Sequence, residues 1–554
     1  MSRYLHGAMI NCFVGALSLI RCPAIMSFPV LSQFASIKIA ATENLSLLAL
    51  ALSAVFALAW YLWIICFRTP KGSPPGPFGL PIVGSLPFLD PELHTYFADL
   101  ARRYGPVLKI MLGKKVCIVV SSPSAAREVL KDQDTTFANR DVPIAARIAT
   151  YGGKDIGWNP YGPEWRMLRK ICVLKMLSNA TLDSVYGLRR REVRTMVKYL
   201  YEQAGSPVNV GEQMFLTILN VVTGMIWGGT LQGEARDMVA AEFRSLVSGI
   251  VALLGKPNVS DFFPGLARFD LQGVAKEMKV LAKQLDGIFE TVIDQRVRME
   301  EEGGGMRSSS NGKDFLAYLL KVKDEEDFNP PLTMAGLKAL LMDMVTGGTD
   351  TSSNMVEFTM AEVMNKPHVL ARVQQELDSV VGKEKVVEES HMGKLPYLQA
   401  VIKESLRLHP ALPLLIPHCP SKDATIGGFT VPKGTRIFVN VWAIHHDPSL
   451  WENPSEFDPG RFLEEGTNKG AMDYGGKDFT YFPFGSGRRI CAGIAMAERM
   501  LMYSLATLLH SFDWRLPEAE KMDLDERFSI VLKKRIPLKP IPTPRLSSPA
   551  LYEE

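Results

Sequence analysis

The stretch Phe484–Gly493 reads FGSGRRICAG and places one cysteine in a glycine-rich, basic loop, just ahead of the helix-prone segment Ala492–Leu508. Cysteine binds metal as the thiolate. Three features favour the thiolate of Cys491: the adjacent Arg488 and Arg489, the N-terminus of the following helix, and backbone N–H groups that small residues leave accessible. Such a thiolate can hold a haem iron and favour cleavage of an O–O bond. The loop therefore indicates Cys491 as a candidate metal ligand, with a structural cysteine in a turn as the alternative.

The segment Met344–Phe358, MVTGGTDTSSNMVEF, carries two adjacent glycines between apolar stretches. In a helix interior each glycine costs about 1 kcal/mol relative to alanine, so a helix that contains both needs a reason for them. Gly347 and Gly348 leave one face without side chains, so that a flat cofactor can approach. Thr351 can donate its hydroxyl back to the Gly347 carbonyl, and with Asp350 it forms an acid–alcohol pair able to deliver protons during oxygen activation. Composition alone leaves a turn open.

Glu404 and Arg407 lie three residues apart on a predicted helix and therefore share a face. Exposed pairs of this kind contribute little to stability, and in isolation a solvated surface pair is the simpler interpretation. The flanking residues are apolar, however, and the downstream stretch Phe457–Phe462, FDPGRF, contains a second arginine, Arg461. Breaking a buried network of one glutamate and two arginines costs several kcal/mol.

The composition limits the possible functions. The chain has 554 residues, 47% of them hydrophobic and 22% charged, as in globular proteins. A net charge of +3 without a long basic run does not indicate nucleic-acid binding. Seven cysteines at wide spacings, with no CxxC pair, predict neither a disulfide framework nor a zinc site. No GxGxxG follows a predicted strand, so the chain has no obvious dinucleotide-binding fold of its own.

The N-terminal part of the chain contains a candidate membrane span. Residues 45–67 carry no charged side chain, and about 20 apolar residues are enough to cross a bilayer core. Arg68 and Lys71 follow, so the positive-inside rule places the remainder of the chain in the cytosol. We predict a transmembrane anchor over 45–67, a proline-rich hinge over 68–81, and a single-pass location in the endoplasmic reticulum membrane.

Residues 1–44 form an N-terminal extension whose status the sequence leaves open. No acidic residue precedes Glu43, and the apolar stretch inside the extension is too short to span a membrane. The extension is compatible with a transit segment, which would place the protein in a plastid. It is equally compatible with translation that starts at Met26.

Helical patterns dominate the remainder, with short β-prone runs between them. The fold class is therefore mostly α with small β-sheets, in one catalytic domain over 82–540, followed by a loose tail over 541–554. A glycine- and serine-rich stretch, Gly303–Gly312, predicts a flexible connection. The predicted helices are 192–204, 274–302, 332–364 and 396–408, and the predicted strands are 107–111, 116–120 and 436–441.

Taken in order along the chain, these stretches resemble the motifs of the cytochromes P450, and the resemblance covers residues 74 to 540. Phe137–Arg140, FANR, and Asp261–Leu266, DFFPGL, are similar to the plant A-type (clan 71) microsomal members, and a 706-like member of that clan is the narrower expectation. The resemblance implies the cytochrome P450 fold preceded by one transmembrane helix. It also favours a helix, not a turn, around the two adjacent glycines.

The resemblance also implies a set of roles for individual residues. Haem b would be the cofactor, with Cys491 as the metal ligand. His418 stands where many relatives have arginine, so its charge would depend on pH. Directly before Arg461, this chain has Gly460 where the family usually has glutamate. The implied cofactor-binding residues are Trp165, Arg169, His418, Phe484, Arg489, Cys491 and Gly493, and the implied structural triad is Glu404, Arg407 and Arg461.

The implied reaction is monooxygenation, in which Asp350 and Thr351 are the catalytic residues that supply protons. Electrons would come from NADPH through NADPH-cytochrome P450 reductase, whose acidic surface could meet Lys170, Lys175 and Arg488. Two other readings remain: a P450 that rearranges peroxides without external oxygen, and a non-catalytic haem-binding membrane protein.

By family position, four segments would line the substrate pocket, and their side chains are largely aliphatic. An apolar pocket suits a hydrocarbon skeleton. We therefore expect an apolar plant secondary metabolite as substrate, with a terpenoid (a sesquiterpene) favoured and a phenylpropanoid or flavonoid as the alternative. The four segments are 141–151, 342–346, 412–416 and 529–531.

Overall fold

A computed structural model describes residues 47–61, 72–228, 233–302, 314–325, 328–463, 473–518 and 520–553. Several predictions fall on other parts of the chain. The N-terminal extension, the end of the anchor (62–67), the start of the hinge (68–71) and the connection 303–312 lie outside the described residues.

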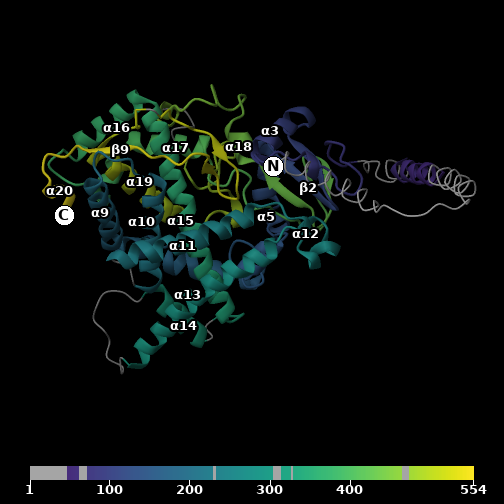
Figure 1. Ribbon diagram of the computed structural model, residues 1–554, viewed down its shortest axis with the longest axis horizontal. Helices are drawn as coiled ribbons and strands as arrows, with labels where there is room; N and C mark the ends of the chain where they lie inside the picture. Colours follow the sequence, from purple (N-terminus) through teal and green to yellow (C-terminus); the bar gives the residue numbers. More distant parts are fainter. Residues whose placement is uncertain are drawn as a thin grey trace, which may run out of the picture.

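The domain is built around one long central helix, α15 (Met334–Asn365), which packs against α10 (Val210–Trp227) and α19 (Ile494–Ser511) (Figure 1). Its first turn is capped by Thr333, whose side chain accepts a hydrogen bond from the Gly336 N–H. The helix runs without interruption through the two adjacent glycines, so the alternative of a turn there is wrong.

The remaining helices surround α15, and most were not assigned from the sequence. The α-helices are α3 (Leu93–Tyr104), α4 (Pro123–Arg127), α5 (Asp134–Phe137), α6 (Ile144–Ala149), α7 (Pro163–Ile171), α8 (Asn179–Ser184), α9 (Tyr186–Glu202), α11 (Gly233–Gly255), α12 (Val259–Phe262), α13 (Val274–Glu302), α14 (Phe315–Glu325), α16 (Pro367–Val380), α17 (Pro396–Leu408), α18 (Val441–His445) and α20 (Ala550–Glu553). Short 3₁₀ or π turns are η1 (Leu86–Phe88), η2 (Glu128–Asp132), η3 (Cys172–Met176), η4 (Pro264–Phe269), η5 (Glu389–Lys394), η6 (Pro459–Phe462) and η7 (Gly487–Arg489).

Four small sheets complete the domain. In the largest, β1 pairs with β2 in antiparallel fashion and β2 pairs with β5 in parallel. The other three are antiparallel pairs: β3 with β4, β6 with β9, and β7 with β8. The strands are β1 (Val107–Leu112), β2 (Lys115–Val120), β3 (Ala424–Ile426), β4 (Phe429–Val431), β5 (Arg436–Val439), β6 (Phe512–Arg515), β7 (Glu526–Arg527), β8 (Lys533–Lys534) and β9 (Ile541–Pro544).

The C-terminal segment differs from the expected loose tail over 541–554. Ile541–Pro544 forms β9 and pairs with β6, while Tyr552 on α20 is 1% exposed. The Tyr552 hydroxyl donates to the Ser511 carbonyl at 2.7 Å and accepts the N–H groups of Arg545 and Leu546 at 2.7 and 2.8 Å. The physical reason is the burial of Ile541, Leu546 and Tyr552, which a proline-rich segment without a regular apolar period does not reveal.

Two apolar helices differ in their surroundings. Leu47–Tyr61 is the described part of the predicted anchor, and its side chains are exposed (Figure 1, purple). Within the described residues, Val210–Trp227 is the one helix with the length and hydropathy to cross a membrane, but 72% of it is buried beneath its neighbours. It is therefore a core helix, and the N-terminal helix is the candidate for a single anchor.

Candidate active site

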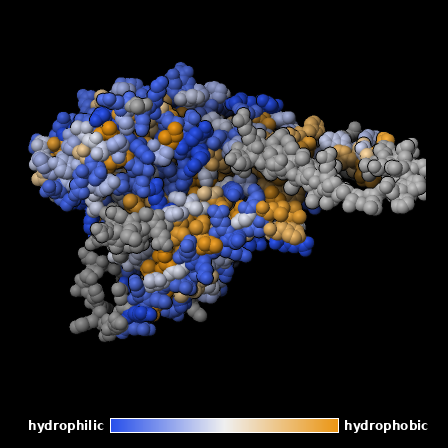
Figure 2. Space-filling view, viewed as in Figure 1, coloured by the Kyte–Doolittle hydropathy of each residue, from blue (hydrophilic) through white to orange (hydrophobic). Residues whose placement is uncertain are grey.

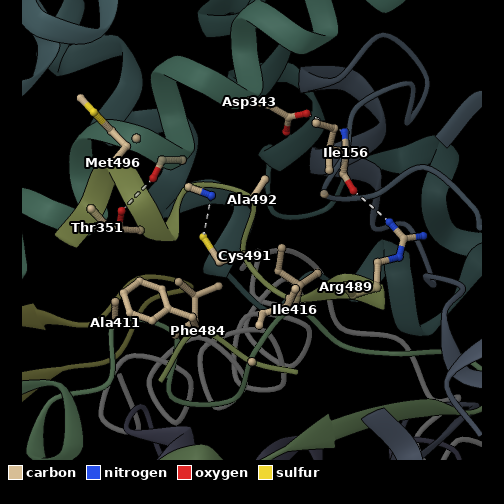
Figure 3. Close-up of a pocket in the computed structure, with 18 of the residues that line it drawn as sticks. Ile156, Asp343, Thr351, Ala411, Ile416, Phe484, Arg489, Cys491, Ala492 and Met496 are labelled. Carbon is tan, nitrogen blue, oxygen red and sulfur yellow. Dashed lines mark hydrogen bonds between the residues drawn. The ribbon is translucent and has the colours of Figure 1, made fainter. Parts of the chain in front are cut away.

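A cavity of about 310 Å³ lies between α15 and the loop that carries Cys491 (Figure 3). Seven of the predicted site residues line it, four from the cysteine loop and one from each of three distant segments. They are Arg169, Thr351, His418, Phe484, Arg489, Cys491 and Gly493.

The loop backbone holds the sulfur of Cys491 toward the cavity. The Cys491 N–H donates to the Phe484 carbonyl at 3.0 Å, which closes the loop. Gly487 has a φ of +68°, and a Cβ there would lie 1.8 Å from the Leu130 carbonyl oxygen, so only glycine fits. In the described part of the chain, Cys491 is the one exposed free cysteine, and it is exposed to the cavity.

The groups around the sulfur are not all those expected from the sequence. Arg489 donates to three backbone carbonyls and Arg488 pairs with Asp134 at 3.0 Å, so neither bonds the sulfur. Burial raises the pKa of the Cys491 thiol, whereas the Gly493 N–H, 3.3 Å from Sγ, and the Arg169 guanidinium act in the opposite direction. The backbone N–H and the following helix α19 are therefore present as expected, and Arg169 takes the place of the loop arginines.

The central helix presents the cavity with a hydroxyl above a bare glycine. The Thr351 hydroxyl donates to the Gly347 carbonyl at 2.7 Å and faces the cavity (Figure 3). A Cβ added at Gly347 would meet nothing within 4 Å, because the space beside it is the cavity itself. Asp350 is buried on another side of the helix, where its Oδ1 accepts from Lys533 Nζ at 2.8 Å. The acid and the alcohol are thus neighbours in sequence but are not brought together in the cavity.

Basic side chains gather at one end of the cavity. Arg169 lines it and donates to the Ile490 carbonyl at 2.7 Å, and Arg489 lines it beside the indole ring of Trp165. The Trp165 N–H donates to the Ile156 carbonyl at 3.0 Å, and Arg489 donates to the same oxygen at 2.9 Å. The expected cluster forms, but in this structure its donors are directed at backbone carbonyls of three segments.

His418 behaves differently from the expected donor. Burial and the nearby Arg140 lower the pKa of His418 well below its usual value, so the ring is neutral. Its Nδ1 lies 2.9 Å from the Phe137 carbonyl oxygen and must carry the proton to bond it. The other ring nitrogen is then an acceptor, which cannot donate to a carboxylate. Arg140, which sequence reasoning used only as a family marker, lines the same cavity and donates to the Ile416 carbonyl at 2.6 Å.

The structure brings the predicted triad together in the core. Arg407 binds Glu404 through two hydrogen bonds of 2.7 and 2.8 Å, and Arg461 Nε lies 3.3 Å from the same carboxylate. Burial raises the pKa of Glu404, and Arg407 opposes that shift. Gly460 is explained locally, because its N–H donates to Asp458 Oδ1 at 2.9 Å and an added Cβ would lie 2.8 Å from that atom.

The expected pocket segments divide between two cavities. Residues in 342–346 and 412–416 line the cavity that contains Cys491. Residues in 141–151 and 529–531 line a neighbouring cavity of about 100 Å³, and Leu415 borders both.

The residues fit a flat, anionic cofactor that is held by a thiolate. A sulfur faces an apolar cavity from one side, a helix surface without side chains faces it from the other, and three arginines (Arg140, Arg169 and Arg489) border it. The fold and this cavity define a mostly helical haem-thiolate enzyme.

Comparisons with known proteins agree with this class. The profile of the family "Cytochrome P450" matches residues 74–540. A flavonoid 3',5'-hydroxylase of Campanula medium is 38% identical over 85% of this chain and 91% of its own length. A ferruginol synthase of Salvia fruticosa is 36% identical over 89% of this chain and 98% of its own length. A zebra fish cytochrome P450 structure with abiraterone superposes with a TM-score of 0.67 at 27% identity, covering 82% of this chain and 99% of that one.

The chain belongs to the cytochrome P450 family. It is a P450 monooxygenase that depends on haem and uses electrons derived from NADPH. The expected fold class is confirmed: a P450 fold, mostly helical with small sheets, and one N-terminal apolar helix as the candidate anchor. Flavonoid and ferruginol biosynthesis among the relatives place it with enzymes of secondary metabolism.

Proposed function

We propose that this enzyme hydroxylates a terpenoid, specifically a sesquiterpene. The observation that carries the proposal is the chemistry of the cavity wall above the cysteine. Most of its side chains are apolar and offer a hydrocarbon no polar partner; they include Val222, Met225, Met344, Met355, Leu412 and Ile416. A ferruginol synthase among the relatives supports a terpenoid-type substrate.

The chain's own residues have separable tasks in this proposal. When bound, haem supplies the oxygen chemistry by which one oxygen atom enters the substrate and the other leaves as water. Cys491 would hold its iron, and Arg140, Arg169 and Arg489 would neutralise its carboxylates. The Thr351 hydroxyl already donates its hydrogen to a carbonyl, so its oxygen can accept a hydrogen bond from a proton donor in the cavity. Asp350 lies on a different side of the helix and pairs with Lys533. The Lys533 side chain is 20% exposed, so it links the buried acid to solvent.

Hydroxylation of a flavonoid is the second candidate. The Campanula hydroxylase is as similar to this chain as the ferruginol synthase is, which is the observation in its favour. A polyphenol needs several hydrogen-bonding partners. Asp343 is an acidic side chain that lines the cavity, but it already accepts the Ile156 N–H at 2.5 Å. We therefore rank it below the sesquiterpene.

We also propose NADPH-cytochrome P450 reductase as the electron donor. Lys170 and Lys175 are exposed on α7 and η3, and α7 meets the cysteine loop through the bond from Arg169 to the Ile490 carbonyl. Arg488 is exposed as well but is paired with Asp134. An acidic partner surface would be attracted to these basic groups and would bind faster at low salt.

We propose an endoplasmic reticulum location, with the domain resting against the membrane from which its anchor emerges. Hydrophobic surface is visible beside α12 on the anchor side of the domain (Figure 2). Exposed apolar side chains continue it on neighbouring segments, and they would be costly to leave in water. They are Phe78, Ile82, Phe88, Leu266, Phe269 and Leu271.

Product profiling by mass spectrometry tests the proposal. Microsomes that contain this chain and a plant reductase would receive NADPH with pooled sesquiterpenes, or with pooled phenylpropanoids and flavonoids. We expect a product heavier by one oxygen in the first pool, dependent on NADPH and absent with Cys491→Ala. A product in the second pool alone would establish the flavonoid alternative. Silence in both pools from an enzyme with an intact carbon monoxide spectrum would refute both substrate assignments.

A further inference from the structure

Two carboxylic acids lie in hydrogen-bond contact within the wall of the cavity. Asp343 projects from α15 and lines the cavity, and Asp155 belongs to the segment between α6 and α7 and is 2% exposed. Both carboxyl groups reach the same point beside Gly157, where an added Cβ would lie 3.1 Å from Asp155 Oδ2 and 3.8 Å from Asp343 Oδ1, and each acts on the pKa of the other as a hydrogen-bonding partner. Neither of them belongs to the residues assigned above to haem binding or to proton delivery.

The contact between these two groups requires a proton. Asp343 Oδ2 accepts the Ile156 N–H at 2.5 Å, and the Gly157 N–H also bonds this carboxyl (Figure 3). Asp155 Oδ1 accepts the Trp158 N–H at 3.1 Å. Ionised carboxylates only accept hydrogen bonds, so two of them cannot bond each other, and two that lie close together repel. A bond between them therefore contains one hydrogen that belongs to the pair.

We propose that Asp343 and Asp155 share one proton, and that this acid–carboxylate pair holds the segment Asp155–Trp158 against α15 as a wall of the substrate cavity. Both are positioning residues, which act through the backbone that they hold. The inference holds whatever the substrate is.

The surroundings place the proton on Asp343 and the charge on Asp155. Burial, and then the neighbouring Asp155, raise the pKa of Asp343 well above its usual value. Burial also raises the pKa of Asp155, to about 6, but the Trp158 N–H and Arg489 oppose that rise and favour the ionised form. Arg140 faces Asp155 as well, whereas Cys172 is the titratable group that faces Asp343 from η3. One negative charge on the pair is thus matched by nearby guanidinium groups.

The pair completes a clamp on the backbone of one residue, Ile156. On its N–H side Ile156 is bonded by Asp343, and on its carbonyl side it is bonded by Trp165 at 3.0 Å and Arg489 at 2.9 Å. The segment that walls the cavity is therefore fixed to the central helix and to the cysteine loop at once. Because the Asp343 oxygens are occupied by these bonds, this acid offers the substrate no free charge.

Infrared difference spectroscopy of the holoenzyme tests the shared proton directly. We expect a carboxylic-acid carbonyl band in the wild type that shifts in D₂O and disappears in Asp343→Asn. Asp141→Asn is the matched control, because Lys115 and Arg436 outweigh the effect of burial and lower the pKa of that carboxyl, so no acid band is lost with it. An acid band that survives in Asp343→Asn unchanged would overturn the proposal.

Titration with 4-phenylimidazole, an apolar ligand of haem iron, tests the positioning role without any turnover. Asparagine can donate to Asp155 and accept from Ile156, so Asp343→Asn should bind within about threefold of the wild type. Asp343→Leu can do neither, and its affinity should fall by about tenfold or more. Equal affinities for the leucine variant and the wild type, with a normal carbon monoxide spectrum, would show that the pair does not shape the cavity. Tighter binding by the asparagine variant would indicate two repelling carboxylates and no shared proton. Should the leucine variant lose its haem, the infrared experiment still decides the question.

Discussion

Lys533 Nζ lies 2.8 Å from Asp350 Oδ1, on a different side of the central helix from the hydroxyl of Thr351. Consecutive residues of an α-helix point about 100° apart, so an acid and an alcohol that adjoin in sequence serve different faces. The alcohol touches the cavity, and the acid touches the β7–β8 hairpin that carries Lys533. Their contributions to catalysis should therefore separate by mutation.

Thr351→Ala should keep the carbon monoxide spectrum and divert reducing equivalents to hydrogen peroxide, because the cavity loses its one hydroxyl above Gly347. Asp350→Asn should lower turnover with a smaller rise in peroxide, since it removes the charge that Lys533 binds but leaves the cavity wall intact. Product formed and peroxide released per NADPH consumed measure both effects. Full product yield from Thr351→Ala would contradict its assigned role.

Cys491→Ala should abolish the thiolate-type spectrum of the ferrous carbon monoxide complex. Cys117→Ala is the matched control, because Cys117 is 0% exposed in β2 and its sulfur has no access to the cavity. The control should keep the spectrum and lose only the stability of one small buried group, about 1 kcal/mol. Loss of the spectrum in both variants would point to misfolding and would leave Cys491 without a special role.

Arg407→Ala should reduce the free energy of unfolding by about 3–5 kcal/mol, because it leaves the buried Glu404 carboxylate without its main partner. Arg102→Ala breaks an exposed pair with Asp99 and should cost less than about 1 kcal/mol. Thermal inactivation of the holoenzyme, followed through the carbon monoxide spectrum at a fixed heating rate, compares the two. Similar shifts for both variants would contradict a buried triad.

A buried charge network predicts how stability depends on pH. Burial lowers the pKa of His409, but hydrogen bonds to Glu362 and Glu526 outweigh it and raise that pKa from 6.5 to about 9. Burial raises the pKa of Glu526, but His409 and His94 outweigh it and lower that pKa from 4.5 to about 2. The histidine contribution is complete below pH 6.5 and is lost as pH rises through 9. The glutamate contribution is complete above pH 4.5 and is lost as pH falls through 2.

Stability from this network should therefore be greatest between pH 4.5 and 6.5. Glu526→Gln should remove about 2 kcal/mol in that window, the contribution of a hydrogen bond to a charged group, and should flatten the profile on the alkaline side. The midpoint of thermal inactivation against pH, in the wild type and the variant, measures this. Parallel profiles for the two proteins would show that the network is neutral.

Charge reversal at Lys170 and Lys175 should slow reductase-supported turnover several-fold and weaken its dependence on salt, because steering acts mainly on encounter. Reversal of the exposed Lys276 and Lys279 on α13 is the matched control and should change little. The dithionite-reduced carbon monoxide spectrum should be normal in both double variants. An unaltered salt dependence in the first would remove these lysines from the electron-donor surface.

Sequence patterns predicted the long elements well and their side-chain directions less well. The predicted helices 274–302 and 396–408 match α13 and α17, since a long apolar period leaves little freedom in the assignment. The triad was also predictable, because its spacing places Glu404 and Arg407 on one face. The directions of Arg488 and Arg489 were not, because a loop has no period from which to infer them.

Pairings between distant segments lie beyond a single sequence. Asp155 and Asp343 each read as ordinary acidic residues, and only the fold places them in contact. The same holds for Lys533 with Asp350. His418 shows a different limit: its position was anticipated, but its protonation depends on burial and on Arg140, which composition does not reveal.

The anchoring of Tyr552 has a consequence for how this domain folds. Its hydroxyl ties the Ser511 carbonyl and the backbone that follows β9 to α20, and Glu526 bonds His94 at 2.9 Å across 432 positions of the chain. Contacts between residues so far apart in the chain form slowly, because a long loop must close before they can be made. We therefore expect the domain to close only when the segment after α19 docks against α3.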